Sequence, residues 1–281
     1  MTIRLSDVHF TYAAGTPWAR PVLKGIDLEV PAGECLGILG GNGSGKTTLV
    51  RHMNGLLLPQ RGTVQVGEVT LTPETKPSRL LSDETGLVFQ FPEKQLFAET
   101  VGEDVAFGLE FAGAPPGEIP SRVDDALRQV GLDPGTYRRR SPFSLNWGEK
   151  RQAAIAGVLA LDTPRLVFDE PGAGLDPAGR RRITGLMREL AGRGKTVIVV
   201  SHHLDDIFRI ADRLVVLGDG RVVFHGSLEE LCRHDDLDRW GLQWPPLIGA
   251  VKAVAARHPG LETAVRTPEE AAAVLRPLLP R

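Results

Sequence analysis

The chain has 281 residues, a formal net charge of −2 and 24% charged residues. This length can hold one large α/β domain with an appendage, or two small domains, around a core that needs no disulfides. The near-neutral balance excludes a globally basic protein, so a nucleic-acid or anionic-membrane role would need a local patch.

Short signals in the chain bear on its compartment. The N-terminal stretch lacks the basic region, apolar segment and cleavage site of a secretory signal, so we expect no leader to be removed. Cys35 lies far from Cys232 in an apolar run, which predicts a buried thiol in a reducing compartment. The longest apolar runs, residues 197–200 and 214–217, are far shorter than the ~20 residues that cross a bilayer. Work at a membrane would therefore depend on partner proteins.

The first part of the chain reads as strands followed by a loop and a helix. Alternating patterns in residues 3–10 and 26–30 predict an antiparallel edge sheet. Residues 34–39 form an apolar run that ends in a glycine-rich loop, and helical composition begins at Lys46. This order predicts a buried strand that delivers the loop to a helix N-terminus.

The middle of the chain changes to helices punctuated by Pro and Gly, which predicts a helical insertion at about residues 91–160. Apolar runs at residues 165–168, 196–200 and 213–217 follow, separated by helical segments. Such runs are typical of a parallel sheet that is covered on both faces.

The last part of the chain, residues 226–281, reads as a small helical appendage to a domain of residues 1–225. Its last helix is predicted to begin at Thr267, with Thr267 as the cap and proline in the first turn. Glu270 is placed to reach back to the cap amide. We expect this appendage to take part in dimerisation.

The glycine-rich loop reads Gly40-Gly-Asn-Gly-Ser-Gly-Lys-Thr47 and satisfies the P-loop pattern. Its glycines let successive backbone N–H groups turn inward around phosphate oxygens at a helix N-terminus. Lys46 would then reach the β- and γ-phosphates, and Thr47 would offer its hydroxyl to Mg²⁺. The sequence therefore predicts a nucleoside triphosphate site at this loop.

The apolar strand of residues 165–168 ends in the acidic pair Asp169 and Glu170. Such a pair is by itself most often a solvated turn or a helix cap, but a P-loop upstream favours a catalytic interpretation. We assign Asp169 to Mg²⁺, through water, and Glu170 to positioning and polarising the nucleophilic water.

These motifs resemble those of ATP-binding cassette proteins. Asp169-Glu-Pro-Gly-Ala-Gly-Leu-Asp-Pro177 is similar to that family's extended Walker B motif and D-loop, and Val200-Ser-His202 to its switch histidine. Gln90 resembles the Q-loop glutamine, and Tyr12 the aromatic residue that stacks on adenine, with Trp18 as the alternative. The resemblance implies an α/β P-loop NTPase fold with an N-terminal antiparallel β subdomain, a helical insertion and a small C-terminal helical appendage.

The resemblance also implies the roles of individual residues. Catalysis would rest on Glu170, on His202, which can hydrogen-bond the γ-phosphate, and on Gln90, which offers a carbonyl to Mg²⁺ and an amide to water. The resemblance assigns Mg²⁺ to Thr47, Gln90 and Asp169. The ATP contacts would come from Tyr12, Gly40, Gly41, Asn42, Gly43, Ser44, Gly45, Lys46, Thr47 and Thr48.

The segment from Gln90 to Gly108 resembles the corresponding one in ATPases of energy-coupling factor transporters, which import vitamins and transition-metal ions. In that family two ATPase subunits, identical or paralogous, dock on a transmembrane coupling protein, and a separate membrane protein binds the substrate. The resemblance implies a peripheral ATPase on the cytoplasmic face of the cell membrane, with no nucleic-acid partner. Phe91, Leu96 and Phe97 would receive a membrane partner's helix, or alternatively pack the insertion.

One segment departs from the family pattern. The signature normally reads Leu-Ser-Gly-Gly-Gln and contacts ATP on the opposite subunit, whereas this chain has Leu145-Asn-Trp-Gly-Glu149. Asn146 can donate a hydrogen bond, but Trp147 adds a side chain where none is expected and Glu149 adds negative charge near phosphate. We expect these residues, with Gly148 and with Asp176 of the D-loop, to act across the dimer. They would impair the partner's ATP site and spare the site with Lys46, which favours a heterodimer with a paralogue.

Two other functions stay open. A soluble cassette ATPase acting on nucleic acid or ribosomes would predict a coiled coil, tandem cassettes or basic arms, and the sequence contains none of them. A regulatory cassette with one degenerate site would bind ATP without turnover, but Glu170 and His202 count against it on this chain's own side. The transported substrate cannot be read from the sequence, because the substrate site lies on another polypeptide.

Overall fold

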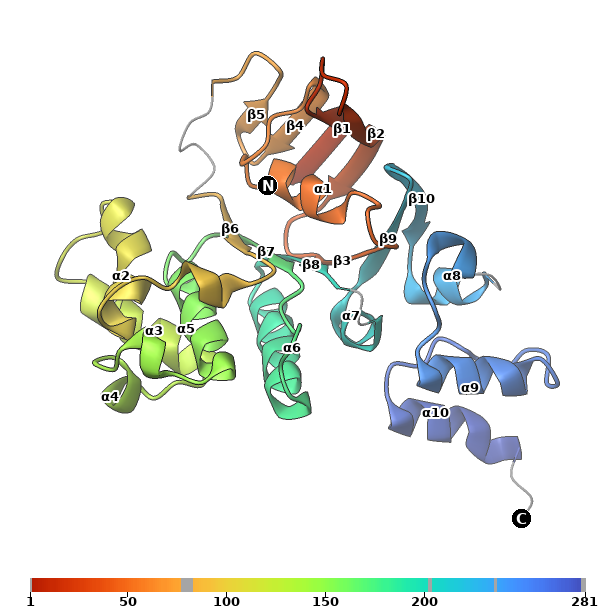
Figure 1. Ribbon diagram of the computed structural model, residues 1–281. Helices are drawn as coiled ribbons and strands as arrows, with labels where there is room; N and C mark the ends of the chain where they lie inside the picture. Colours follow the sequence, from red (N-terminus) through yellow and green to blue (C-terminus); the bar gives the residue numbers. More distant parts are fainter. Residues whose placement is uncertain (1, 77–82, 202–203, 235–236, 279–281) are drawn as a thin grey trace.

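A computed structural model describes residues 2–76, 83–201, 204–234 and 237–278 of the chain (Figure 1). Its strands form two sheets, and the smaller one lies toward the N-terminus. This four-stranded sheet has the order β2-β1-β4-β5, and all its neighbouring strands are antiparallel. Its strands are β1 (Ile3–Tyr12), β2 (Arg20–Val30), β4 (Arg61–Val66) and β5 (Val69–Leu71). The predicted antiparallel edge sheet is confirmed.

The second sheet lies across the middle of the molecule and has the order β10-β9-β3-β8-β7-β6. Its first five strands in chain order run parallel, and β10 joins antiparallel at one edge. The strands are β3 (Cys35–Leu39), β6 (Thr85–Val88), β7 (Arg165–Asp169), β8 (Thr196–Val200), β9 (Arg213–Gly218) and β10 (Arg221–Gly226). Strands β3, β6, β7 and β8 are buried along their whole length, as expected for a parallel sheet covered on both faces.

Two apolar cores lie on the two faces of this parallel sheet. Because side chains alternate along a strand, Leu36 and Ile38 of β3 enter the core shared with helix α1 (Lys46–Met53) and the antiparallel sheet. Cys35 and Leu39 enter the opposite core, which α6 (Pro177–Gly192) and α7 (Leu204–Ile210) help to cover. Burial raises the pKa of the Cys35 thiol to about 12, so the thiol stays neutral, as its apolar setting predicts.

A group of helices follows β6 and stands to one side of the parallel sheet (Figure 1). Its four α-helices are α2 (Val101–Phe111), α3 (Ile119–Val130), α4 (Pro134–Tyr137) and α5 (Trp147–Leu159). Short 3₁₀ helices at Pro92–Gln95 and Pro142–Ser144 connect them to the sheet and to each other. Helices α2 and α3 pack their buried faces on α5, so α5 is the central helix of the group.

The C-terminal part lies at the other side of the sheet (Figure 1). Its helices are α8 (Leu228–Cys232), α9 (Pro246–Ala255) and α10 (Pro268–Leu275), with 3₁₀ helices at Asp238–Trp240 and Arg276–Leu278. Thr267 caps α10 as predicted, because its hydroxyl accepts from the Glu270 N–H. The expected return contact was wrong: the Glu270 carboxylate accepts from the Arg266 N–H, one residue before the cap.

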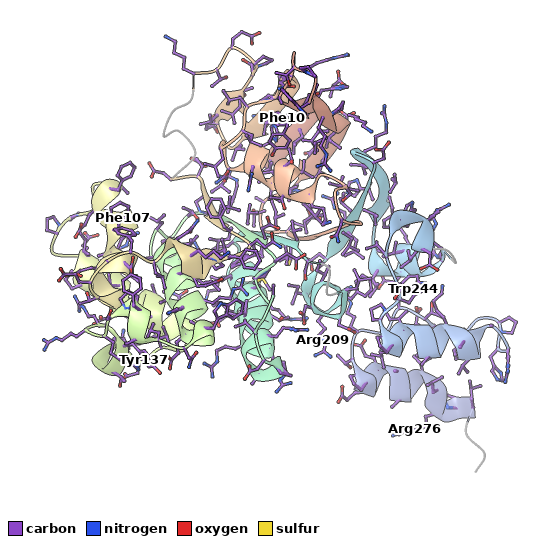
Figure 2. All side chains as sticks on the ribbon, viewed as in Figure 1. Phe10, Phe107, Tyr137, Arg209, Trp244 and Arg276 are labelled. Carbon is purple, nitrogen blue, oxygen red and sulfur yellow. The ribbon has the colours of Figure 1, made fainter. Side chains whose placement is uncertain are left out.

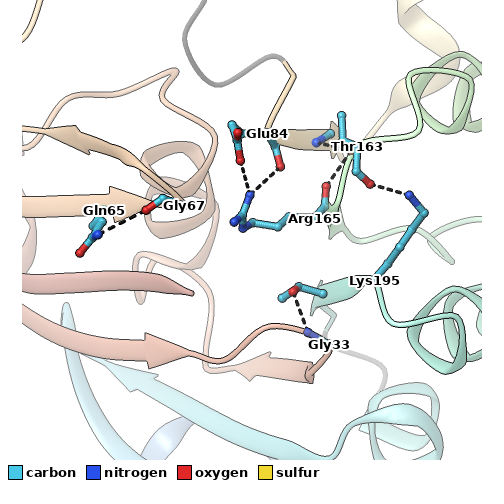
Figure 3. A network of polar contacts seen from close by, with 9 residues as sticks. Gly33, Gln65, Gly67, Glu84, Thr163, Arg165 and Lys195 are labelled. Carbon is cyan, nitrogen blue, oxygen red and sulfur yellow. Dashed lines mark hydrogen bonds and ion pairs between the residues drawn. The ribbon is translucent and has the colours of Figure 1, made fainter. Parts of the chain in front are cut away.

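Polar contacts tie the strands together at the end of the sheet that lies away from Asp169 (Figure 3). The guanidinium of Arg165, buried at the start of β7, binds the Glu84 carboxylate just before β6. The Thr163 hydroxyl accepts from the Gly86 N–H at 3.1 Å and donates to the Arg165 carbonyl at 2.9 Å. Lys195, before β8, donates to the Thr163 carbonyl at 2.7 Å. These contacts hold three adjacent strands in register, which positions their opposite ends.

Within the described ranges, the helices are too short or too polar for any of them to span a membrane.

Candidate functional site: a nucleotide cavity at the carboxyl ends of the parallel strands

A cavity of about 290 Å³ opens where the carboxyl ends of β3, β7 and β8 meet. Parallel strands that share an edge bring residues from distant parts of the sequence together there, which is where ligands bind in such sheets. The cavity is lined by Tyr12, Arg20, Val22, Asn42, Gly43, Gly45, Lys46, Thr47, Thr48, Gln90, Asp169, Glu170 and Val200. It therefore gathers most of the predicted ATP, metal and catalytic residues in one place.

The glycine-rich loop forms the floor of this cavity between β3 and α1. Its backbone is left-handed at Gly43 and Gly45, with φ of 78° and 107°, a conformation that favours glycine. Helix α1 begins at Lys46 without a side-chain cap among the described residues, so its first N–H groups face the cavity without a capping oxygen. Such an N-terminus is suited to an anion.

The Lys46 ammonium bridges the start of the same loop. It donates to the carbonyls of Gly40 at 2.7 Å and Gly41 at 2.9 Å. Burial lowers the pKa of Lys46, an effect that the nearby carboxylates of Glu170 and Asp169 oppose. Gly40, Gly41 and Ser44 thus shape the loop, although they are not among the residues that line the cavity.

Asp169 and Thr47 both line the cavity and lie close to each other. Burial raises the pKa of Asp169, an effect that the nearby Thr47 hydroxyl opposes. The carboxylate oxygen Oδ1 of Asp169 is buried and has no hydrogen-bond partner among the described residues. An unpartnered buried carboxylate oxygen beside a hydroxyl is a donor set that suits Mg²⁺, and Gln90 adds an amide oxygen to the same cavity.

Glu170 follows Asp169 directly but has a different environment. Its backbone is left-handed, with φ of 53°, and its N–H donates to the Val200 carbonyl at 2.8 Å. Its buried carboxylate accepts from the Ser201 hydroxyl at 3.4 Å. A non-glycine residue in this conformation is strained, and such strain is found at functional sites. The conformation turns Glu170 away from the course of the β-strand.

Tyr12 lies at the cavity edge, at the end of β1. Its ring packs edge-on against Phe10 with centroids 4.9 Å apart, and its hydroxyl lies 3.3 Å from the Thr48 hydroxyl. Trp18, the alternative aromatic, is 81% exposed and is not among the residues that line the cavity. The geometry therefore favours Tyr12 as the residue that meets a base.

Two neighbours of this cavity were missed by the sequence reasoning. Arg20 pairs with Tyr12 across the β1–β2 hairpin and brings a cation to the cavity. Bulges shift the register of that hairpin, so no simple count along the sequence gives the pairing. The Trp240 carbonyl accepts from the Gly41 N–H at 3.1 Å, a contact between C-terminal part and P-loop for which the sequence carries no signal. His202 lies outside the described residues.

The predicted signature residues lie elsewhere. Asn146, Trp147, Gly148, Glu149 and Asp176 line a second cavity of about 390 Å³ between the start of α5 and the start of α6. Within the described parts of the chain, the two cavities share no lining residue. The signature is therefore separate from the chain's own nucleotide cavity.

The changed signature residues support the start of α5. Asn146 caps the helix, because its side-chain oxygen accepts from the Glu149 N–H at 2.9 Å and Glu149 accepts from the Asn146 N–H at 2.9 Å. The Tyr137 hydroxyl also donates to Glu149 at 2.8 Å. These bonds, the one from the Asn146 backbone foremost, lower the pKa of Glu149 and keep it charged. The predicted negative charge is thus present, with both carboxylate oxygens hydrogen-bonded.

A third, mainly apolar groove of about 260 Å³ lies between the start of α2, the preceding loop and α5. It is lined by Gln95, Leu96, Phe97, Asp104, Phe107, Gly108, Ala153, Ala154, Gly157 and Val158. Phe97 is 59% exposed and packs edge-on against Phe107, and Phe107 stacks on Phe111. Phe107 lies at the outer edge of the helical group (Figure 2). Of the predicted docking residues, Leu96 and Phe97 line the groove.

Residues 23–173 match the family model described as ABC transporter. The chain is similar to EcfA2, the energy-coupling factor transporter ATP-binding protein, of Symbiobacterium thermophilum, with 43% identity over 99% of this chain and 97% of that one. It is also similar to EcfA2 of Latilactobacillus sakei, with 40% identity over 100% and 98% of the two chains.

Solved structures agree with this. The chain is similar to cbiO1 from Clostridium perfringens, part of the ABC transporter complex cbiONQ, with a TM-score of 0.73, 32% identity and coverage of 92% and 95%. It is similar to the ATP-binding cassette MJ0796, a dimer in a post-hydrolysis state bound to ADP and Pi, with a TM-score of 0.73, 28% identity and coverage of 80% and 98%. The predicted P-loop fold is confirmed.

Proposed function

The chain belongs to the ABC transporter family, among the ATP-binding proteins of energy-coupling factor transporters, and on that basis we propose that its ATP hydrolysis drives import through separate membrane subunits. The observation that carries this proposal is the cavity that brings Lys46, Asp169, Glu170 and Gln90 together at one edge of the parallel sheet. The imported substrate would be a vitamin or a transition-metal ion.

The residues of the cavity divide the work of hydrolysis. Backbone N–H groups at the start of α1 and the Lys46 ammonium would bind the phosphates, and Tyr12 would stack on the adenine. Glu170 would hold and polarise the attacking water, because its carboxylate is buried at the cavity and oriented by the Ser201 hydroxyl. Gln90 and His202 would complete the contacts around the γ-phosphate.

Mg²⁺ fits the oxygen donors on one side of the cavity. Thr47, Gln90 and Asp169 would hold it, with Asp169 acting through water. When bound, the ion would neutralise charge on the phosphate oxygens. The unpartnered Oδ1 of Asp169 supports this assignment, because a buried carboxylate oxygen without a hydrogen bond is costly unless a cation or water meets it.

A second cassette would complete the ATP site. The separation of the signature cavity from the nucleotide cavity supports a dimer in which each ATP lies between one P-loop and the opposite signature. Trp147 is 42% exposed at the helix N-terminus where backbone approach to phosphate is needed. We therefore favour a heterodimer with a paralogue whose signature is intact, and a regulatory cassette with one degenerate site is the second candidate that Trp147 supports.

The apolar groove beside α2 would receive the membrane partner. Exposed aromatic residues there, Phe97, Phe107 and Phe111, form a surface that suits an apolar or amphipathic helix. The chain would then be a peripheral protein on the cytoplasmic face of the cell membrane, held by a transmembrane coupling protein beside a substrate-binding membrane protein. Residues 1–225 would be the nucleotide-binding domain, with its helical subdomain at about 91–160, and residues 226–281 a dimerisation appendage.

The test is co-purification of the tagged chain from detergent-solubilised membranes, followed by identification of the accompanying proteins and small ligand. We expect a second cassette and membrane proteins with the parent chain, and at least a tenfold loss of the membrane proteins with Phe97→Glu. The matched control is Val223→Glu, which puts the same charge on an exposed apolar residue of β10. Both variants should bind ATP normally.

The outcomes separate two failures. If the parent chain brings down no membrane protein, the proposed transport function is wrong. If it does and Phe97→Glu behaves like Val223→Glu, only the docking groove has been misplaced.

A further inference from the structure

Arg151 lies in the second turn of α5, and its side chain is fully buried between two loops of the nucleotide cavity. One guanidinium nitrogen donates to the Gln90 carbonyl at 2.6 Å. Another donates to the Ala173 carbonyl in the loop after Glu170. A single side chain from the signature helix therefore joins the backbones of two segments that carry proposed catalytic residues.

The loop that begins at Glu170 is a short turn closed by a backbone hydrogen bond. The Ala173 N–H donates to the Glu170 carbonyl at 3.2 Å, so the carbonyl that Arg151 holds belongs to the same turn as Glu170. Burial lowers the pKa of Arg151, and Glu93 and Glu170 oppose this, which also places the two carboxylates near the guanidinium. Movement of Ala173 would therefore move the backbone of Glu170.

The remaining faces of the guanidinium are also covered. Its Nε lies 3.6 Å from a carboxylate oxygen of Glu93 in the segment after Gln90. The Trp147 ring covers the guanidinium, with 4.9 Å between the guanidinium carbon and the ring centroid. The same ring lies so close to Gly174 that a Cβ there would come within 2.2 Å of it. Trp147 and Arg151 thus both contact the turn of residues 170–174 in the same chain.

We propose that Arg151 is a positioning residue for ATP hydrolysis, which fixes the Gln90 segment and the Glu170 turn relative to each other and to the signature helix. It would contact neither nucleotide nor water, and would act through the two carbonyls that it holds. The role rests on the functions proposed above for Gln90 and Glu170. It also links the signature of this chain to its own hydrolytic residues, in addition to any contact across a dimer.

The planar guanidinium is suited to this role because its N–H groups point in fixed directions and can bind two carbonyls at once. A lysine ammonium keeps the charge opposite Glu93 but is a flexible point donor that does not reproduce the fork. Arg151→Lys should therefore hold the two segments less firmly, and Arg151→Gln should release both and leave the Glu93 carboxylate buried without its cation.

The experiment measures the ATPase kcat of the complete transporter complex and the ATP Kd of the isolated chain. For Arg151→Lys we expect kcat to fall about tenfold, and for Arg151→Gln more than that, with the Kd for ATP within twofold of the parent. A fold defect alone would weaken binding and turnover together, so the separation of kcat from Kd identifies positioning. If Arg151→Gln does not fold, Arg151→Lys alone decides.

Arg122→Gln is the matched control. Arg122 lies in the same helical group, and its guanidinium likewise donates two hydrogen bonds, at 3.2 and 2.8 Å, to one carbonyl, that of Ala160 at the end of α5. Its loss should lower the melting temperature without changing kcat.

Glu170→Gln, measured in parallel, separates a failure of the proposed catalytic site from a failure of the positioning role of Arg151. If Glu170→Gln hydrolyses ATP at the parent rate, the proposed site itself is wrong. If Glu170→Gln is inactive while Arg151→Lys keeps kcat within twofold, or loses no more than Arg122→Gln, the positioning role is overturned.

Discussion

Asp169 and Glu170 are neighbours in the chain, yet the backbone gives them different tasks. Asp169 ends β7 in extended conformation and meets Thr47, whereas the left-handed backbone of Glu170 brings its carboxylate to Ser201. The Lys46 ammonium in the P-loop lies near both carboxylates and donates hydrogen bonds to two carbonyls of its own loop. At the scale of single residues, the site therefore provides one group for the proposed phosphate binding and a different one for the proposed action on water.

This separation predicts two distinct mutant phenotypes. Lys46→Ala should raise the ATP Kd about 10- to 100-fold, because a charged hydrogen bond contributes about 1.5–3 kcal/mol. Glu170→Gln should keep the Kd within twofold and lower kcat at least about 100-fold, because it removes a general base that acts only in the transition state. Titration calorimetry with the isolated chain and phosphate release from the complex measure the two constants. Parallel changes in both constants for either variant would contradict the division of roles.

At the scale of the element, helix α5 combines a capped first turn with an aromatic ring that covers Arg151. Its first turn is capped by the reciprocal bonds of Asn146 and Glu149, so the helix start loses nothing by lacking serine. Its first residue is Trp147, whose ring covers Arg151 and lies against Gly174. We therefore expect the altered signature to hinder access to the helix N-terminus and to leave the helix cap intact.

Restoring the signature should move activity and stability in opposite directions. The triple variant Asn146→Ser, Trp147→Gly and Glu149→Gln retains a capping box but loses the contacts of the Trp147 ring, which should cost about 2 kcal/mol, or about 4–8 °C in Tm. ATPase activity of the isolated chain as a homodimer should rise about tenfold, because phosphate gains access to the opposite helix N-terminus. The complex with an intact paralogue should change less.

The ATPase assay of the homodimer tests whether Trp147 obstructs the signature. If the parent homodimer already hydrolyses ATP as fast as the restored one, Trp147 does not obstruct the signature, and the case for an asymmetric pair is lost.

At the scale of the whole molecule, the C-terminal part is joined to the cassette at the P-loop. The Trp240 carbonyl accepts from Gly41, and the Trp240 ring belongs to an aromatic cluster with Phe224 and His234. Arg266 donates to the carbonyls of Phe208 and Ala211 at the end of α7. These two contacts are among those that join the appendage to the parallel-sheet layer, and the first of them is at the P-loop.

Disturbing the contact between the Trp240 carbonyl and Gly41 should weaken nucleotide binding, although the changed residue does not line the cavity. A side chain at Gly241 would meet the Gly41 backbone at 3.2 Å, and both Gly241 and Gly260 have positive φ, of 68° and 93°. Gly241→Val should therefore raise the ATP Kd several-fold. Gly260→Val carries the same backbone strain in open space, so it should lower Tm without changing the Kd. Equal ATP affinity in the two variants would show that the P-loop does not depend on the appendage.

The sequence by itself determined the features that depend on short spacing. The P-loop from Gly40 to Thr47, the pair Asp169 and Glu170 and the positions of strands along the chain follow from local rules: glycines at a strand-to-helix turn, acidic residues after an apolar run, alternation in an edge sheet. The family resemblance predicts Gln90 at the same site as Asp169, and the parallel strands, whose carboxyl ends meet at one edge, account for its place in that cavity.

Only the tertiary structure decided the contacts that join distant segments. Arg151 reaches Gln90 and Ala173, and Trp240 reaches Gly41, through packing for which no spacing rule exists. The pairing of Arg20 with Tyr12 depends on bulges that shift the hairpin register, and a shift of one residue moves a side chain to the other face. Local sequence specifies which groups can do the chemistry, whereas long-range packing sets what holds them in place.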